Sequence, residues 1–349
     1  MKKTLVALAV LAASGASFAQ VTMTGYFEYH YRATTDVAGN GAGGFGTDGS
    51  ELFFNASDDL GGGLKAAVSM GIAGADRSSE SGNFNGTGQN SAVIGLDGFI
   101  TIGSESLGTF KLGTTQPGDY LSGGIAGVAG YGWDGQLYDG LSNRDSVGYS
   151  KGFGPVKASF TYYEPAKIVG EGTGTYGGAG NSGTNQRKNS YGLTYESGPL
   201  AANLSFGTYD QSGNTATTAA GYLTNVYDLS AAYDFGVAKV GAGVEKKTFN
   251  VGTRQDTLLG VSFPVGALTL GAQVGQRSFS GVQTGGTSNG SNLQADASGN
   301  GSVNATAVTA KYALSKRTYV GAKYSSWGTS AVSGVSNSNQ TDLYIGSSF

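Results

Sequence analysis

The stretch VTMTGYFEYHYR, residues 21–32, alternates between two kinds of side chain with a period of two. One set of positions holds valine, methionine, glycine, phenylalanine and tyrosine, and the other holds threonine, tyrosine and charged residues. Successive side chains of a β-strand point to opposite faces of the sheet, so the stretch predicts a strand with one apolar and one polar face. In an α-helix the same apolar residues would scatter around the cylinder.

The same alternation recurs along the rest of the chain. It is found in residues 64–72, 156–163, 200–207, 227–235, 238–244, 257–263, 268–274, 306–314, 320–324 and 341–349. Short turns rich in Gly, Pro or Asp are expected at 58–63, 106–108, 151–155, 197–199, 235–237, 263–267 and 315–317. Longer polar loops are expected at 36–49, 75–90, 116–143, 165–185, 210–223, 248–255, 280–304 and 328–339. Tight and long connections therefore alternate, which predicts about 16 antiparallel strands.

The residue types on the polar face indicate whether that face lines the interior of the barrel or covers its exterior. A soluble barrel of this length would need apolar side chains to fill its interior, yet the second face holds mainly Thr, Ser, Gly, Asn, Lys and Glu. We therefore expect the polar face to line a lumen and the apolar face to contact lipid. Closure satisfies every backbone hydrogen bond in hydrocarbon, so the fold class is an all-β, transmembrane antiparallel barrel. Pairing of the last strand with the first would place Phe349 in the wall.

The composition excludes several classes of protein. Of the 349 residues, 62 are Gly, 1 is His and none is Cys, so the chain has no disulfide, no thiol nucleophile and no cysteine ligand for zinc. Charged residues make up 13%, about half the usual share. Phosphate binding requires clustered positive charge, and the net charge here is −3, which argues against nucleic acid as a partner. We expect no cofactor and no metal ion.

The N-terminus has the pattern of a secretory signal. Lys2 and Lys3 precede a short apolar run at residues 5–13, and the small residues Ser17 and Ala19 fit a cleavage site after Ala19. The run is about half the length that a membrane-spanning helix requires. We therefore expect a cleaved signal at residues 1–19 and a barrel domain at 20–349, in which 19 positive and 24 negative charges leave a net charge of −5.

The whole mature chain resembles the Gram-negative general porins, particularly the betaproteobacterial type. The resemblance is carried by VTMTGYFEY at the start, SDDLGGGLKA at 57–66, LGTFKLGTT at 107–115, NRDSVGYSKGFGPVKASFTYY at 143–163 and the terminal Phe349. It implies a homotrimer of 16-stranded barrels in the outer membrane, with a long third loop folded into the lumen. By order along the chain, that loop is residues 116–143. Relatives often have wall arginines where Glu51, Thr114 and Gly148 stand here, so an anion preference does not follow from the resemblance alone.

The third loop and the inward phase of the strands supply candidate lumen residues. We expect acids of the loop to face bases of the wall, which would set a transverse field acting on ions and dipolar solutes. Salt screens such charges over about 8 Å, so a charge far from the narrowest section would have no measurable effect. The candidates are Asp119, Asp134, Asp139, Arg144 and Asp145 on or beside the loop, and Glu28, His30, Arg32, Asp97, Lys111 and Lys323 on the strands.

Three short motifs match patterns of enzymatic or ligand-binding sites, but each lacks the structural context that its pattern requires. GYSKG at 148–152 fits a nucleophile elbow, but that motif requires a strand-to-helix turn and a downstream histidine, whereas His30 lies upstream. GTGTYG at 172–177 fits a dinucleotide fingerprint without a following helix. GGFGTD at 43–48 resembles half of one calcium-binding repeat and occurs once.

Three functions are compatible with these features. The first is a porin through which small hydrophilic solutes and ions diffuse passively, with outer-membrane lipids around it. The second is a secreted or surface-exposed adhesive β protein that binds partners through its long loops. The third is an outer-membrane hydrolase that depends on His30. The inside-out polarity of the strands favours the first.

Overall fold

The computed structural model describes residues 20–35, 39–73, 94–115, 121–133, 137–138, 144–164, 187–210, 223–250, 252–281, 301–327 and 339–349. The predicted signal, residues 1–19, lies outside these ranges. No helix in the described part of the chain is long and apolar enough to cross a membrane.

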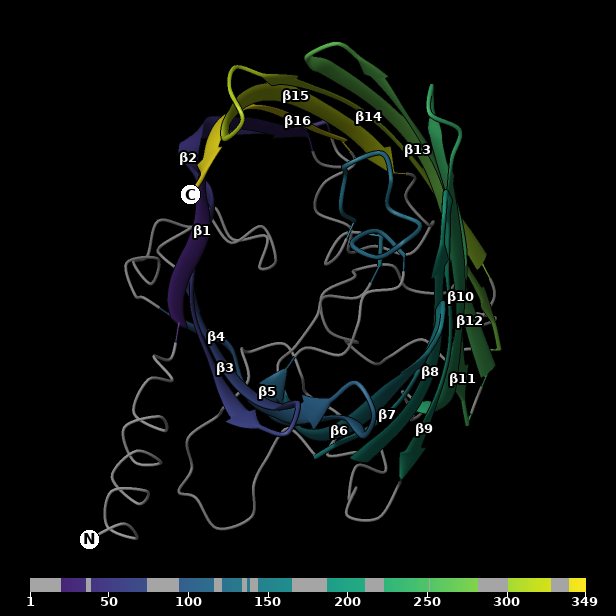
Figure 1. The fold of residues 1–349 in the computed structure, drawn as a ribbon. Coiled ribbons are helices and arrows are strands. Elements are labelled where there is room, and N and C mark those ends of the chain that lie inside the picture. Colours follow the sequence, from purple (N-terminus) through teal and green to yellow (C-terminus); the bar gives the residue numbers. More distant parts are fainter. Residues whose placement is uncertain are drawn as a thin grey trace, which may run out of the picture.

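Sixteen strands form one closed antiparallel barrel (Figure 1). Their bounds are β1 Gln20–Thr35, β2 Gly41–Gly61, β3 Leu64–Ala73, β4 Ile94–Ser104, β5 Gly108–Thr115, β6 Arg144–Phe153, β7 Val156–Tyr163, β8 Arg187–Ser197, β9 Leu200–Asp210, β10 Leu223–Asp234, β11 Lys239–Phe249, β12 Gly252–Val265, β13 Leu268–Ser280, β14 Gly301–Ala313, β15 Thr318–Trp327 and β16 Asn339–Ser348. Each strand pairs with its neighbours in the sequence, and β16 pairs with β1. The predicted fold class and strand number are confirmed.

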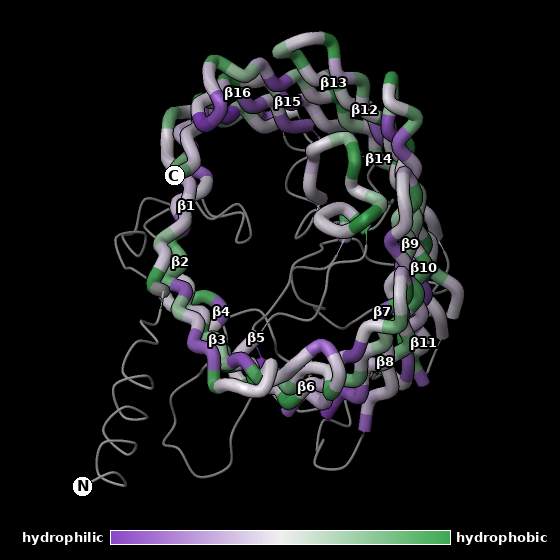
Figure 2. Tube along the Cα trace, viewed as in Figure 1, coloured by the Kyte–Doolittle hydropathy of each residue, from purple (hydrophilic) through white to green (hydrophobic). Residues whose placement is uncertain are grey.

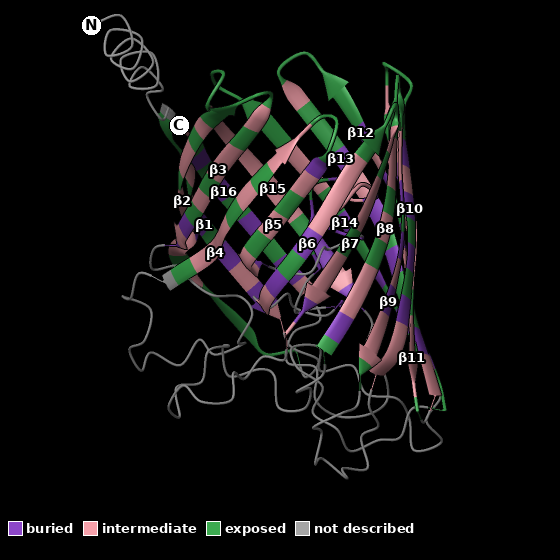
Figure 3. Cartoon of the chain, turned by 60° about the horizontal axis from the view of Figure 1, so that its bottom comes forward, coloured by how far each residue is buried: buried purple, intermediate pink, exposed green. Residues whose placement is uncertain are grey.

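The period-two pattern places apolar side chains on the outside of the barrel. On β1, Met23 is 60% exposed and Phe27 47%, whereas His30, in the opposite phase, is 1% exposed. Hydrophilic and hydrophobic positions alternate along the wall (Figure 2), and exposed positions alternate with less exposed ones along the strands (Figure 3). An outer face of exposed apolar side chains is suited to lipid, and closure leaves no unpaired sheet edge.

The short turns were predicted better than the long loops. Gly61 at the end of β2 and Gly62 and Gly63 in the turn to β3 all have positive φ, a conformation that only glycine adopts readily. Two predicted loops are wrong. Most of 36–49 belongs to β2, which begins at Gly41, and 248–255 is a tight connection, since β11 ends at Phe249 and β12 begins at Gly252. Both stretches are rich in Gly, Thr and Asn, so they lack the apolar alternation that marks a strand.

The barrel closes through the last residue described. Phe349 and Gly25 exchange two backbone hydrogen bonds, with N–O distances of 2.9 and 3.1 Å. The Phe349 ring lies over Gly25, and a Cβ at that position would come within 2.8 Å of the ring. The prediction that Phe349 lies in the wall beside the first strand is confirmed.

We expect Phe349→Ala to lower the unfolding free energy by about 1–2 kcal/mol, less than the ~3–5 kcal/mol of a buried phenylalanine, because this ring is 55% exposed. Denaturant titration in detergent micelles, followed by far-UV circular dichroism, measures the change. Phe263→Ala removes a comparably exposed outer ring away from the seam and serves as the control. Equal stability of the two variants would contradict a closing role for the Phe349 ring.

Candidate functional site

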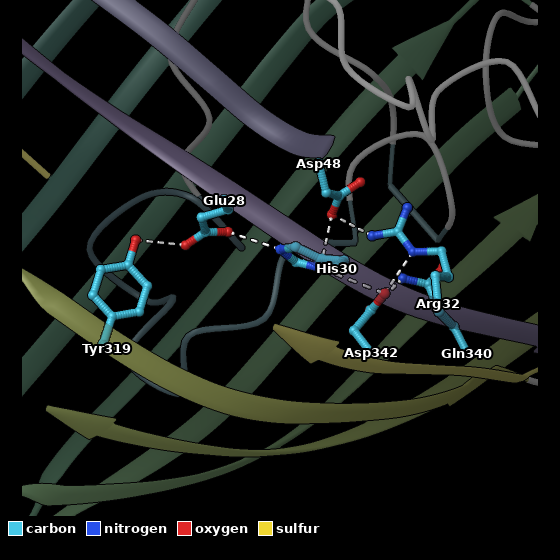
Figure 4. Close-up of polar contacts among 7 residues, drawn as sticks. All are labelled: Glu28, His30, Arg32, Asp48, Tyr319, Gln340 and Asp342. Carbon is cyan, nitrogen blue, oxygen red and sulfur yellow. Dashed lines mark hydrogen bonds and ion pairs between the residues drawn. The ribbon is translucent and has the colours of Figure 1, made fainter. Parts of the chain in front are cut away.

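The inner wall carries a polar network where the first and last strands meet (Figure 4). Arg32 Nε donates to Asp342 Oδ1 at 2.6 Å, and Arg32 Nη2 also contacts Asp48. His30 Nε2 lies 3.1 Å from Glu28 Oε2, and Nδ1 lies 3.3 Å from Asp48 Oδ2. We call these five residues the seam network, because they join β1, β2 and β16 across the closure of the barrel.

Strand register explains how these side chains come together. Arg32 pairs with Asp342 and His30 with Tyr344, so the acid and the base are direct cross-strand neighbours on the inner face. In β2 a bulge lies opposite the step from Glu28 to Tyr29, and it leaves Asp48 as the extra residue. Because a bulge re-aims one side chain, Asp48 points inward to Arg32 instead of taking the outward phase.

Neighbouring side chains complete the seam network. Tyr319 Oη donates to Glu28 Oε1 at 2.7 Å, and Gln340 Nε2 donates to Asp342 Oδ2 at 2.7 Å. Arg32, 5% exposed, and Asp342, 1% exposed, form an ion pair with little access to water. A buried pair of this kind is costly to break, because the remaining charge loses its partner.

The seam network contains residues of the type that bind metal ions. Ligand atoms of His30, Asp48 and Asp342 all lie within 4.8 Å of one another. Arg32 contacts both aspartates, however, and its guanidinium therefore supplies the positive charge that a cation would bring. The arrangement is that of a charge cluster in which Arg32 compensates part of the negative charge of the carboxylates.

Other acids of the described inner wall also have partners within the wall. Arg277 makes two 2.6 Å hydrogen bonds to the two carboxylate oxygens of Asp256 on the neighbouring strand. Lys247 Nζ lies 2.6 Å from Glu245 Oε1. Asp228 accepts a 2.6 Å hydrogen bond from Ser205.

Several inward lysines are placed differently, with their ammonium groups over aromatic rings. Lys311 Nζ lies 3.6 Å from the Tyr319 ring centroid, and Lys323 Nζ lies 4.8 Å from the Tyr344 ring centroid. Lys111 Nζ lies 3.8 Å from the Phe99 ring centroid. Such contacts orient an ammonium group without neutralising its charge. Several wall acids therefore make close contacts with a base or a hydroxyl group, whereas these three lysines form no close ion pair with a described carboxylate.

The predicted site residues divide into groups. Glu28, His30 and Arg32 belong to the seam network, and Lys111 and Lys323 lie on the inner face as expected. Asp97 lies in the irregular part of β4 and interacts electrostatically with Lys111. Asp119, Asp134 and Asp139 lie outside the described residues, so it stays a prediction that they face the bases of the wall.

The two residues at the start of β6 face opposite ways. Arg144 pairs with Thr115, in the inward phase, whereas Asp145 pairs with Thr114, whose phase is that of the exposed Phe110 and Leu112. Thr114 donates a 2.5 Å hydrogen bond to Asp145. The register therefore places Asp145 on the outer face, and Thr114 likewise does not occupy a lumen position.

Sequence reasoning missed Asp48 and Asp342. The alternation in residues 341–349 places Leu343 and Ile345 outward and so could have indicated Asp342 as inward. Asp48 fell within a predicted loop, and no local signal marks the bulge that turns it inward.

Part of the third loop lies inside the ring of strands (Figure 1). We call its described residues, 121–133 and 137–138, the inner loop. Trp133 Nε1 donates to Ser325 Oγ at 2.8 Å, Gln273 Nε2 donates to the Tyr131 carbonyl at 3.0 Å, and Tyr138 Oη donates to the Thr257 carbonyl. An apolar cluster accompanies these bonds. It comprises Leu121, Ala126, Tyr131, Trp133, Leu137 and Tyr138 of the inner loop and Leu258, Phe279, Val303, Ala305, Ala307 and Trp327 of the wall.

This cluster corrects one expectation about the lumen. The inner face was expected to be polar throughout, yet β12 to β15 present apolar side chains where the inner loop covers them. Trp133 and Leu137 are fully buried in this contact. Burial of that size stabilises the position of the inner loop by several kcal/mol.

We expect Asp342→Asn to lower the unfolding free energy by about 3 kcal/mol, because it removes one charge of a buried ion pair. Denaturant titration in micelles measures the loss. Glu105→Gln, in an exposed turn, should change the free energy by less than about 0.5 kcal/mol. If both variants unfold like the wild type, the seam network does not stabilise closure.

Comparison with known proteins identifies the barrel. The family model described as Gram-negative porin matches residues 4–331. Outer membrane porin protein 32 of Delftia acidovorans is 32% identical over 293 residues, which are 77% of each chain.

Two solved structures have the same fold. An anion-selective porin from Comamonas acidovorans is 20% identical, with a TM-score of 0.64 over 95% of this chain and all of that one. The trimer form of OmpT, an outer membrane protein of Vibrio cholerae, is 12% identical, with a TM-score of 0.60 over 95% of this chain and 99% of that one. Family match, sequence identity and closed 16-stranded barrel agree, and they favour a channel over the adhesive alternative. The chain belongs to the Gram-negative porin family and forms an outer-membrane channel for passive diffusion.

Proposed function

We propose that this porin conducts small anions in preference to cations. The observation that carries the proposal is the unequal compensation of charge on the described inner wall. Asp48 and Asp342 are both held by Arg32, and Asp256 is held by Arg277. Lys111, Lys311 and Lys323 lie over aromatic rings instead of forming close ion pairs with described carboxylates. Lys111 interacts electrostatically with Asp97, and Lys323 with Glu28, without such a close pair.

Further lysines strengthen the positive side of the lumen. Lys65 on β3 and Lys157 on β7 share the inward phase with Lys111 on β5, and Lys111 interacts electrostatically with Lys157. In a ring of 16 strands β5 lies opposite β13, on which the inner loop rests (Figure 1). These bases therefore face the loop side across the lumen. Fixed charges on a low-dielectric wall raise the local concentration of counter-ions.

The acids of the third loop would complete a transverse field. We propose that Asp119, Asp134 and Asp139 provide negative charge opposite the wall lysines, which orients dipolar solutes as they pass. The name of the Comamonas relative describes that protein as anion-selective, which is consistent with an anion preference here.

Solutes are proposed to cross without covalent change. An enzymatic hypothesis would depend on His30, but that residue is 1% exposed and both of its ring nitrogens face carboxylates. A solute in the lumen therefore has no direct access to an unengaged imidazole nitrogen. Replacement of His30 by Ala is expected to leave diffusion of solutes largely intact.

The assembly is proposed to be a homotrimer, as the family resemblance implies. The Vibrio cholerae relative is described in a trimer form, which supports this state. Mass measurement of the detergent-solubilised protein by light scattering tests it, and a monomer in mild detergent would contradict it.

We expect the variant with Lys65, Lys111 and Lys157 all changed to Gln to shift the zero-current potential in a KCl gradient toward cation preference. Removing three inward positive charges lowers the local chloride concentration. The variant with Asp119, Asp134 and Asp139 changed to Asn should shift the potential in the opposite direction. Planar-bilayer recording of purified protein provides both values.

Lys246→Gln is the matched control, because Lys246 is an exposed residue on β11 in the outward phase opposite Tyr227. Its zero-current potential should equal that of the wild type. An unchanged potential in the lysine variant would refute the anion preference, and an unchanged potential in the aspartate variant would refute the role of the loop acids.

A further inference from the structure

The inner loop touches the wall through its main chain as well as its side chains. Thr309 Oγ1 on β14 donates to the carbonyl of Ala129, and Gln273 on β13 donates to the carbonyl of Tyr131. Main-chain contacts of this kind fix the distance between the inner loop and the wall. That distance determines how far the inner loop projects into the lumen (Figure 1).

Two wall glycines lie directly beneath loop carbonyls. A Cβ at Gly241 would meet the Ala126 carbonyl oxygen, and it would lie 2.8 Å from Val128 Cγ1. A Cβ at Gly271 would meet the Ala129 carbonyl oxygen and lie 2.5 Å from Thr309 Oγ1. All four of these separations are below 3.0 Å, and real Cβ atoms essentially never lie so close to another heavy atom.

The backbone conformation does not require glycine at either position. Neither Gly241 nor Gly271 has a positive φ, unlike the glycines of the turns. Both sit within regular ladders, where Gly241 pairs with Ala232 and Gly260, and Gly271 pairs with Ser262 and Thr309. Glycine in a strand interior often marks close approach of another segment of backbone. The approaching segment here is the inner loop.

An added methyl group would displace the inner loop more readily than the wall. Strands β11 and β13 are hydrogen-bonded to neighbours on both sides along most of their length, so moving either one strains two ladders. The inner loop is held by a few side-chain hydrogen bonds and by apolar packing. It therefore yields first, and movement away from the wall takes it toward the centre of the lumen.

We propose that Gly241 and Gly271 are positioning residues that set the width of the pore, because the absence of a side chain at these positions lets the inner loop lie close against the wall. The proposal rests on the channel function and adds a determinant of solute size to it. Neither glycine needs to touch a passing solute, since each acts through the main chain of the inner loop.

The test compares Gly241→Ala and Gly271→Ala with Gly260→Ala. Gly260 lies on β12 beneath the same inner loop, but its nearest contact for an added Cβ is Val128 Cγ2 at 3.4 Å, an ordinary van der Waals distance. We expect the first two variants to show a lower unit conductance in planar bilayers than the wild type. In liposome-swelling assays their permeability to neutral sugars should fall more steeply with sugar size. Gly260→Ala should match the wild type in both assays.

The outcomes separate this proposal from the others. Wild-type conductance and sugar permeability in Gly241→Ala and Gly271→Ala would overturn it, and so would an equal loss in Gly260→Ala. A stable wild-type channel with cation preference would refute only the proposed anion preference. Thermal stability in micelles, measured on the same samples, distinguishes a narrowed pore from a partly unfolded barrel.

A second variant keeps the proposal testable if the alanine substitutions prevent folding. Thr309→Val removes the hydrogen bond to the Ala129 carbonyl and adds no bulk beneath the inner loop. If the wall holds the inner loop in place, this variant should show larger current fluctuations at an open-channel conductance close to the wild-type value. Current noise equal to that of the wild type would then overturn the proposal.

Discussion

The structure depends on the hydrogen-bonded pairing of β1 with β16. In hydrocarbon each unsatisfied N–H or C=O group costs several kcal/mol, so a sheet with open edges is excluded. Pairing from Tyr26 with Ser348 to Thr35 with Asn339 removes both edges at once. Closure also divides the side chains into two populations, because a closed sheet has one face toward lipid and one face toward the lumen. The phase of a residue along its strand therefore determines whether its side chain faces lipid or the lumen, and so which function it can have.

The same pairing brings together the charges of the seam network. Arg32 and Asp342 come from opposite ends of the sequence, and only the β1–β16 register makes them neighbours. Glu28 extends the contact to β15 through Tyr319. Closure of the barrel and the ion pair of Asp342 with Arg32 are thus two results of one register. Lys111, Lys311 and Lys323 lie over aromatic rings and form no close ion pair with a described carboxylate, and this difference is the basis for the proposed anion preference.

Period two predicted the strands and the inward phase of Glu28, His30, Arg32, Lys111 and Lys323 from the sequence alone. It failed where alternation is interrupted or weak. Asp48 faces inward because a bulge shifts the phase by one residue, and such a shift leaves no mark in residue types. Residues 41–49 form a strand without apolar alternation, so composition alone indicated a loop. Asp145 was grouped with Arg144 by proximity in sequence, although adjacent residues of a strand face opposite sides.

The contact between the inner loop and the wall could be predicted from the sequence only in part. One row of the register runs from Leu258 through Gly275 and Ala305 to Trp327, across β12 to β15. All four residues take the inward phase, where water would favour polar side chains. Apolar and glycine residues at adjacent inward positions therefore mark a part of the wall that another segment of the chain covers. Sequence alone cannot assign that segment, because neighbouring strands must first be placed in register. Once the register is known, Trp133 and Leu137 identify the covering segment, since apolar side chains of a lumen loop require an apolar surface to bury them.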